Sequence, residues 1–335
     1  MEGKMLYSGK DLRKLIIPLI IEQILAIAVG MADTIMVSAA GEAAVSGVSL
    51  VDTVNILLIN VFSALATGGA VVSGHFLGKK KREDACKSAW QILLFATLLA
   101  FVISVIFITA HDPLLRLMFG KIEDDVMKAS KTYLIITTYS FVALAIYNSC
   151  AALFRAMNES KVTMWVSLLM NVINVVGNAI CIYGLHMGVA GVAIPTTISR
   201  YVAAVVIFLL MFQTKKEINL CGQITWKFNG SLIKKILYIA IPNGLENSMF
   251  QLGKILVMSA VATMGTSAIA ANAVTGTIAN WNNLPGFAIN LAIVSVVSVC
   301  VGAGRYDQAR YYTRRLCRDA MIGISCLSII LYLSA

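Results

Sequence analysis

Charged residues are scarce in this chain of 335 residues: Asp, Glu, Lys and Arg make up 13% of it, against about 25% in an average soluble domain. Hydrophobic residues make up 59%. This composition excludes a disordered segment, a collagen and a small disulfide scaffold, and it leaves too little polar surface for an ordinary water-soluble enzyme. Apolar runs of about 20 residues recur along the chain, so lipid is the expected solvent.

Sequence patterns that hold metals, disulfides or nucleotides are also lacking. The 7 cysteines form no C-x-x-C pair, and the 3 histidines have no metal-ligand spacing. No H-E-x-x-H, G-x-S-x-G or Walker sequence occurs, which argues against an enzyme and against ATP as an energy source. We therefore predict no cofactor and no bound metal other than Na⁺. Because an ion gradient is the remaining source of energy, the coupling ion is expected to be Na⁺ or H⁺.

Nine apolar segments are long enough to cross a membrane, where only helices satisfy the backbone polar groups. The first of these segments carries Glu22 and Asp33 and is too long for a signal peptide, so it is expected to be retained. The predicted fold class is an all-α polytopic membrane protein. The segments lie near residues 14–38, 45–75, 88–110, 130–154, 162–184, 189–212, 235–261, 271–301 and 314–334.

Basic residues outnumber acidic ones, 27 to 17, and they are distributed unevenly. Most lie in segments that the helices place on one side of the membrane, such as KKKREDACK at 79–87, whereas few, such as Arg116 and Lys128, lie on the other side. The positive-inside rule then predicts a cytoplasmic N-terminus. It also explains the net charge of +10 without a nucleic-acid partner. The alternative for the 79–87 run is a patch that binds lipid headgroups.

An internal repeat, in which residues match later residues at one constant spacing, is the most informative feature of the sequence. The surrounding segments agree in kind, as in LGKKKREDA against VGAGRYDQA. Both copies begin on the same side of the membrane, so the sequence predicts a parallel repeat that arose by gene duplication. The matching pairs are Pro18 and Pro242, Glu22 and Glu246, Gly78 and Gly302, and Ala85 and Ala309.

The repeat predicts three parts of the chain. Residues 1–213 form a six-helix N-terminal lobe, residues 214–234 a cytoplasmic linker, and residues 235–335 three helices of a second lobe. A complete second copy requires three more helices. We therefore expect a twelve-helix parent, of which this chain is a form truncated after the ninth helix.

Ionisable and amide side chains at bilayer depth are the candidate functional groups. A charged residue there costs about 2.5–3.5 kcal/mol on insertion scales, so it usually faces a cavity or a partner. Glu22 and Asp33 share one face of the first helix, which suits a cation or proton path; the alternative is two separate ion pairs. Asn171, Asn174 and Asn178 also share a face, which either lines a cavity or holds helices together.

Proline positions mark two further candidates. Pro242 removes a backbone hydrogen bond and frees a carbonyl one turn earlier, and a carboxylate beside such a turn, here Glu246, is a candidate cation site. The alternative is a kink stabilised by polar packing, and Pro18 is predicted to kink the first helix in the same way. Lys254 is expected to neutralise an acid or repel a cationic substrate, and Arg200 to pair with an acid.

Several of these segments resemble the MATE family (multidrug and toxic compound extrusion). The resemblance implies two six-helix lobes around a central cleft, and export of cationic amphipathic compounds across the cell membrane in exchange for Na⁺ or H⁺. We expect a monomer in the lipid bilayer. The matching segments are IPLIIEQILAIAVGMADTIMVS for the family's first helix, NAICIYGLHMGVAGVAIPTTISR for its helix 5–6 junction, IPNGLENSMFQLGK for its seventh helix and SVCVGAGRYDQAR for its inner loop.

The resemblance also implies roles for individual residues. Asp33 is the expected coupling carboxylate and Asn174 a cation-site position. Asn178 stands where one branch of the family has an Asp, which removes one acid from a first-lobe proton site. The predicted coupling-ion residues are therefore Asp33, Asn174 and Asn178, and the predicted cleft residues are Glu22, Glu246 and Lys254.

Two alternatives to an antiporter follow from the same residues. A lipid-linked oligosaccharide flippase of the same superfamily needs a basic cleft for pyrophosphate, whereas only Arg200 and Lys254 are available within the helices. A fragment without transport activity is the second alternative, because half of the second lobe is expected to be missing.

Overall fold

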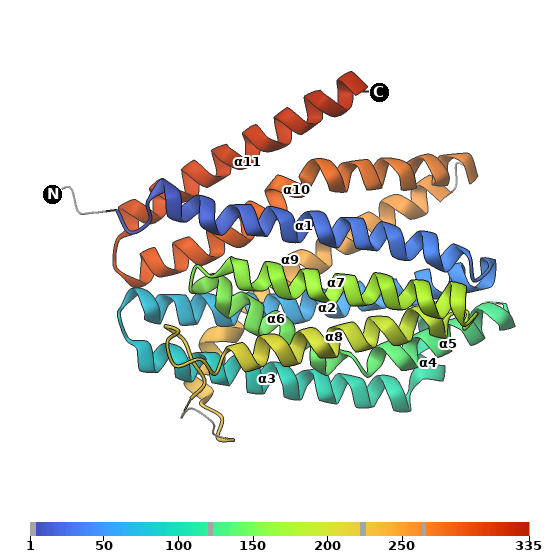
Figure 1. Ribbon diagram of the computed structural model, residues 1–335, viewed down its shortest axis with the longest axis horizontal. Helices are drawn as coiled ribbons and strands as arrows, with labels where there is room; N and C mark the ends of the chain where they lie inside the picture. The colour runs from blue at the N-terminus through green and yellow to red at the C-terminus, as the bar shows by residue number, and fades with distance from the viewer. Residues whose placement is uncertain (1–4, 120–122, 222–225, 263–265, 335) are drawn as a thin grey trace.

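The computed structural model describes residues 5–119, 123–221, 226–262 and 266–334, and these form a single bundle of helices (Figure 1). The prediction of an all-α membrane protein is confirmed, with no strand among the described residues. The elements are α1 (Gly9–Ser38), α2 (Glu42–Gly78), α3 (Arg82–Thr109), α4 (His111–Phe119), α5 (Asp124–Thr138), α6 (Phe141–Ala156), α7 (Ser160–Ala179), the π-helix η1 (Ile180–Gly184), α8 (Ala190–Leu210), α9 (Gly230–Ala262), α10 (Thr266–Gly302) and α11 (Tyr306–Ser334).

The number of membrane spans differs from the predicted nine. Among the described residues, seven helices are long and apolar enough to cross a membrane, or eight if α5 and α6 together count as one span. Helix α9 is not one of them, because polar residues such as Asn243, Glu246 and Lys254 interrupt its apolar run. The short helix α4 was not predicted.

The segment predicted as one span at 130–154 is broken, and α5 and α6 meet at an angle of 50°. Helix α8 satisfies the polar groups at this break. Arg200 Nη1 donates to Ser140 Oγ at 2.8 Å, and the Tyr201 hydroxyl donates to the Tyr139 carbonyl at 2.8 Å. Arg200 therefore binds a hydroxyl at the break, and no acid lies within ion-pair distance of it among the described residues.

The repeat is visible in the helix boundaries. Helices α10 and α11 begin at the repeat counterparts of the residues that begin α2 and α3, and α10 ends at Gly302, the counterpart of the last residue of α2. The turns between these helices match as well, because the counterparts Lys80 (φ 58°) and Gly304 (φ 71°) both adopt the left-handed conformation. The two copies thus fold alike over the part of the second copy that is described.

Helices α2 and α10 cross at two glycines that are repeat counterparts. A Cβ on Gly78 would lie 2.1 Å from the Val299 carbonyl oxygen, and a Cβ on Gly302 would lie 2.2 Å from the His75 carbonyl oxygen. The contact is reciprocal, since His75 and Val299 are also counterparts. This crossing joins the copies at the end of the bundle where α1 and α9 begin and α2 and α10 end, which we call the basic end (Figure 1).

The segment predicted as a linker, 214–234, is shorter than expected and partly packed. Helix α9 begins at Gly230, within it. Arg82 at the start of α3 donates to the carbonyl oxygens of Thr214, Lys216 and Glu217 at 2.6–3.0 Å, and the side chains of Ile218 and Leu220 are fully buried. Ile218 and Leu220 therefore belong to the hydrophobic core that includes Cys86 and Ala89 of α3.

The two prolines predicted as kinks lie inside continuous helices, α1 and α9. Pro18 leaves the Lys14 carbonyl without its helical donor. The Ser160 hydroxyl at the start of α7 contacts that oxygen at 3.3 Å and donates to the Leu15 carbonyl at 2.8 Å. A neighbouring helix thus supplies the hydrogen bond that the proline removes, as expected inside a membrane.

Candidate functional site

Asp33, Asn174 and Asn178 come together between α1 and α7. Asn178 Nδ2 donates to Asp33 Oδ1 at 2.8 Å and contacts Asn174 Oδ1 at 3.4 Å. Asn174 in turn donates to the Thr196 hydroxyl at 2.9 Å. Both asparagines are buried, because they lie on the face of α7 that packs against α1 and α8. The predicted coupling-ion residues therefore form one connected polar cluster.

A cavity of about 130 Å³ adjoins this cluster and holds a second carboxylate. Asp33 and Asp52 both line it, together with Thr34, Ser49 and Tyr133. Asp52 accepts hydrogen bonds from Asn55 Nδ2 at 3.2 Å and from the Tyr133 hydroxyl at 3.1 Å. We call this cavity the two-acid cavity. Its polar lining is made of oxygen atoms, which are the preferred ligands of hard cations.

The Asn178 Oδ1 oxygen lacks a hydrogen-bond partner among the described residues, as does Asn55 Oδ1 beside Asp52. Asn178 is fully buried, and a buried amide oxygen without a partner costs free energy. A small cation or a proton on Asp33 would supply a favourable interaction near this oxygen. The residues present therefore fit a bound cation.

Glu22 and Arg155 form a buried ion pair between α1 and α6. Arg155 Nη1 lies 3.4 Å from Glu22 Oε1, and the Thr163 hydroxyl donates to Glu22 Oε2 at 2.9 Å. Side-chain exposures of 13% for Arg155 and 11% for Glu22 mean that water screens the pair only weakly. Of the two interpretations of Glu22, the ion pair with a neighbouring helix is the one observed.

A larger cavity, of about 340 Å³, lies between the two copies. Glu246 and Arg155 line it, so a carboxylate of one copy and a guanidinium of the other face the same space. We call it the central cavity. Glu22 is not among its lining residues and lies behind Arg155. Its other polar lining residues are Asn60, Ser63, Thr67, Asn243, Asn247, Asn290 and Ser295.

Lys254 does not line this cavity. Its side chain is exposed on α9, with Nζ 4.9 Å from the centroid of the Phe250 ring. It forms no ion pair with an acid among the described residues. Its predicted place in the cleft therefore has no support from the geometry.

Sequence reasoning gave no site role to Asp52, Tyr133 and Arg155. Arg155 looked like one more basic residue at a helix end, and Tyr133 like an ordinary aromatic in an apolar run. Their partners lie far away in the chain, 81 residues for Tyr133 and Asp52 and 133 residues for Arg155 and Glu22. A local sequence pattern does not predict contacts between residues so far apart in the chain.

Two relatives with curated descriptions are similar over most of this chain. The uncharacterized transporter YisQ of Bacillus subtilis is 28% identical over 297 residues, which is 87% of this chain and 64% of YisQ. The probable multidrug resistance protein NorM of Thermotoga maritima is 25% identical over 302 residues, which is 89% of this chain and 64% of that protein. The chain thus aligns with less than two thirds of the length of each of these two relatives.

Solved structures share the fold. One is described as the outward-facing conformation of a multidrug resistance MATE family transporter of the MOP superfamily; it has a TM-score of 0.88, 21% identity, and coverage of 97% of this chain and 71% of its own. A MOP superfamily transporter from Pyrococcus furiosus has the same TM-score and identity and is covered to 72%. At this identity the likeness establishes the fold alone.

The MatE family model matches residues 18–180 and 242–335, more than half of the chain. The two matched stretches begin at Pro18 and Pro242, which are counterparts in the repeat. The all-helical fold and the relatives agree with this match. The chain therefore belongs to the MatE family.

Proposed function

We propose that this chain acts in an ion-coupled efflux transporter of the cell membrane, with a cytoplasmic N-terminus. The transporter exports cationic amphipathic compounds in exchange for Na⁺ or H⁺. The family, and the relatives named as multidrug resistance proteins, support the transport of drugs. The observation that carries the coupling step is the half-buried Asp33 carboxylate, which is held by Asn178 at the edge of an oxygen-lined cavity.

In this proposal the coupling ion binds at Asp33. Two carboxylates share the two-acid cavity, and like charges in such a space favour uptake of a cation or proton. Ion binding neutralises Asp33 and changes its contact with Asn178, so α1 and α7 have two preferred packings. A ligand shifts an equilibrium between two states only by its difference in affinity for them, and this difference is the source of coupling.

The central cavity is the proposed place of the exported compound. Glu246 supplies a negative charge for a cationic group, and the surrounding asparagines supply hydrogen bonds that tolerate different ligands. The two lobes, residues 1–213 and the part of the second lobe in 235–335, would move relative to each other around this cavity. The two-acid cavity and the central cavity both involve α1 or its direct partners, which allows one to influence the other.

Transport by purified protein tests this function. The chain is reconstituted into proteoliposomes, ethidium movement is followed by fluorescence, and an inward Na⁺ or H⁺ gradient is imposed. One of the two gradients is expected to drive ethidium movement by the wild type, and Asp33→Asn is expected to abolish it, because the neutral amide takes up no proton and has no charge to balance a bound cation. Asp125→Asn is the matched control, since Asp125 is 81% exposed and its ion pair with Lys128 is equally exposed.

Two results would contradict the proposal. The first is ethidium transport by Asp33→Asn at the wild-type rate. The second is an absence of gradient-driven transport by a wild-type chain that is folded and correctly inserted, which is the outcome expected of a fragment without transport activity.

A further inference from the structure

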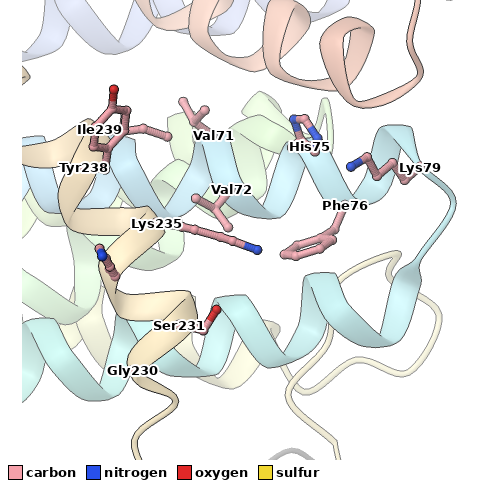
Figure 2. Close-up of a pocket in the computed structure, with 11 residues that line it drawn as sticks. Val71, Val72, His75, Phe76, Lys79, Gly230, Ser231, Lys235, Tyr238 and Ile239 are labelled. Atoms are coloured by element: carbon pink, nitrogen blue, oxygen red, sulfur yellow. The ribbon is translucent and has the colours of Figure 1, made fainter.

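A groove of about 700 Å³ lies outside both cavities, between α2 and the start of α9 at the basic end. Figure 2 shows its floor and walls: Val71, Val72 and Phe76 come from α2, and Tyr238 and Ile239 from α9. These side chains are apolar or aromatic. The groove is large enough for a small-molecule ligand, because such sites have volumes of about 300–1,000 Å³.

The internal repeat gives this groove a counterpart with a different side-chain filling. Its counterpart lies between α10 and the start of α1, where Tyr7 and Tyr312 fill the interface with ring centroids 5.8 Å apart. The Tyr312 hydroxyl donates to the Tyr7 carbonyl at 2.7 Å, and Tyr312 is fully enclosed. The repeat counterparts of these tyrosines are Ser231 and Ser88. Ser231 lines the groove, so a small hydroxyl side chain stands there in place of the Tyr7 ring, whereas Ser88 is buried outside the lining.

The charged side chains that line the groove are all basic. Lys79, Lys234 and Lys235 line it together with His75, and no acidic side chain is among the described lining residues. Lys235 extends toward Phe76 in Figure 2, with Nζ 5.9 Å from the ring centroid. A cationic drug would be repelled here, whereas an anionic group would be attracted.

The basic and apolar parts of the groove lie at different depths. Lys79 caps the last turn of α2 and Lys234 is in the first turns of α9, so the lysines lie at the basic end of the bundle. Val71, Val72 and Ile239 lie deeper along the same helices. Tyr238 in the groove wall is 82% exposed, as aromatic side chains at a membrane interface often are. A lipid with an anionic headgroup and apolar acyl chains has the same arrangement, with charge at the end of the helices and apolar groups deeper along them.

We infer that this groove binds an anionic phospholipid of the leaflet at the basic end. The lysines would hold the phosphate-bearing headgroup, and the apolar walls would hold the glycerol and the upper part of an acyl chain. Basic pockets between helices on this side of a membrane suit such headgroups. A free phosphate would use the lysines alone and would leave the apolar walls without a role.

Lipid titration followed by native mass spectrometry tests this site. The full chain is purified in detergent and titrated with dioleoyl phosphatidylglycerol or dioleoyl phosphatidylcholine, and the dissociation constant of the first bound lipid is measured. The wild type is expected to prefer phosphatidylglycerol. Each lysine removed, in Lys234→Gln and Lys235→Gln, is expected to weaken that binding about fivefold.

Two further variants separate this groove from general attraction to basic residues. Lys10→Gln is the matched control, because Lys10 is the repeat counterpart of Lys234 and lies beside the closed Tyr7 interface. It is expected to leave the dissociation constant unchanged. Ser231→Tyr restores the aromatic residue of the closed interface and is expected to remove the preference for phosphatidylglycerol while all lysines remain.

Three results would overturn the inference. They are equal dissociation constants for the two lipids, a loss in Lys234→Gln and Lys235→Gln no larger than in Lys10→Gln, and displacement of phosphatidylglycerol by inorganic phosphate alone. The last result would mean that the apolar walls contribute nothing. Unchanged melting temperatures of the variants in detergent are required for each comparison.

Discussion

At the scale of single residues, Arg155 occupies an unusual place between two acids that are repeat counterparts. It contacts Glu22 at 3.4 Å and lines the cavity that Glu246 also lines. Glu22 is buried, and its carboxylate contacts Arg155 and accepts a hydrogen bond from Thr163. Glu246 faces open space and is available to a ligand. The same residue type at equivalent positions therefore has a structural environment in one copy and a ligand-accessible environment in the other.

Replacement of Arg155 tests whether the ion pair with Glu22 stabilises the protein. Arg155→Gln leaves the Glu22 carboxylate buried without its cationic partner, which typically costs about 3–5 kcal/mol. We expect a lower free energy of unfolding in detergent, measured with denaturant. The double variant Glu22→Gln with Arg155→Gln is expected to recover most of the loss, because no charge is then left without a partner.

A double variant as unstable as Arg155→Gln would contradict this account of the pair. Lys128→Gln serves as the control, since Lys128 forms an exposed ion pair with Asp125. Exposed pairs contribute about 0–1 kcal/mol, so this change should have little effect.

The residues of the Asp33 cluster could be predicted from the sequence, but their contacts with distant residues could not. Asp33, Asn174 and Asn178 were identifiable because a carboxylate and a regular asparagine spacing are conspicuous in apolar helices. Tyr133 and Arg155 were not, since their partners depend on how distant helices pack. Lys254 was conspicuous for the same reason as Asp33, yet it lies on an exposed face, because charge alone does not tell which way a helix faces.

At the scale of helices, the crossing of α2 and α10 depends on two glycines. Gly78 and Gly302 let the two backbones approach so closely that a Cβ on either would collide with a carbonyl oxygen of the other helix. The chain cannot relieve such a clash by moving a side chain, because the obstructing atom belongs to the backbone. The contact at the basic end is therefore specific to glycine.

Gly302→Ala is expected to destabilise the protein by about 1–3 kcal/mol, as overpacking at a closed contact usually does. The measurement is the free energy of unfolding in detergent. Gly253→Ala is the matched control, because a Cβ on Gly253 in α9 has nothing within 4 Å. Equal stability of the two variants would mean that the helices do not meet at Gly302.

Helix boundaries were predictable where the repeat was present and less so elsewhere. The predicted segments 45–75 and 271–301 correspond to α2 and α10, which begin and end at repeat counterparts. The break at Tyr139 and Ser140 was hidden within an apolar run, because the groups that satisfy it, Arg200 and Tyr201, come from α8. Breaks in membrane helices depend on partners elsewhere in the chain.

At the scale of the whole molecule, the account joins two sites through one set of helices. The two-acid cavity lies toward the end of the bundle opposite the basic end, where α1 ends and α2 begins, and the central cavity lies between the copies. Helix α1 contacts α7 and α10, and α2 contacts α6 and α10. A change in packing at Asp33 on α1 can therefore reach the central cavity. The order of helices and the repeat were predictable from sequence, and the family resemblance implied a central cleft, whereas the two-acid cavity arises from side-chain packing and was not predicted.

The central claim is that a cation at Asp33 opposes binding of the exported compound. The most direct measurement is the dissociation constant of ethidium for the wild type and Asp33→Asn in lipid nanodiscs, as a function of Na⁺ concentration and of pH. Reciprocal linkage between two sites typically changes affinity about 5–150-fold. The account predicts that the coupling ion weakens ethidium binding to the wild type within this range, and that Asp33→Asn shows no such dependence. An ion dependence of the same size in Asp33→Asn, or none in the wild type, would contradict it.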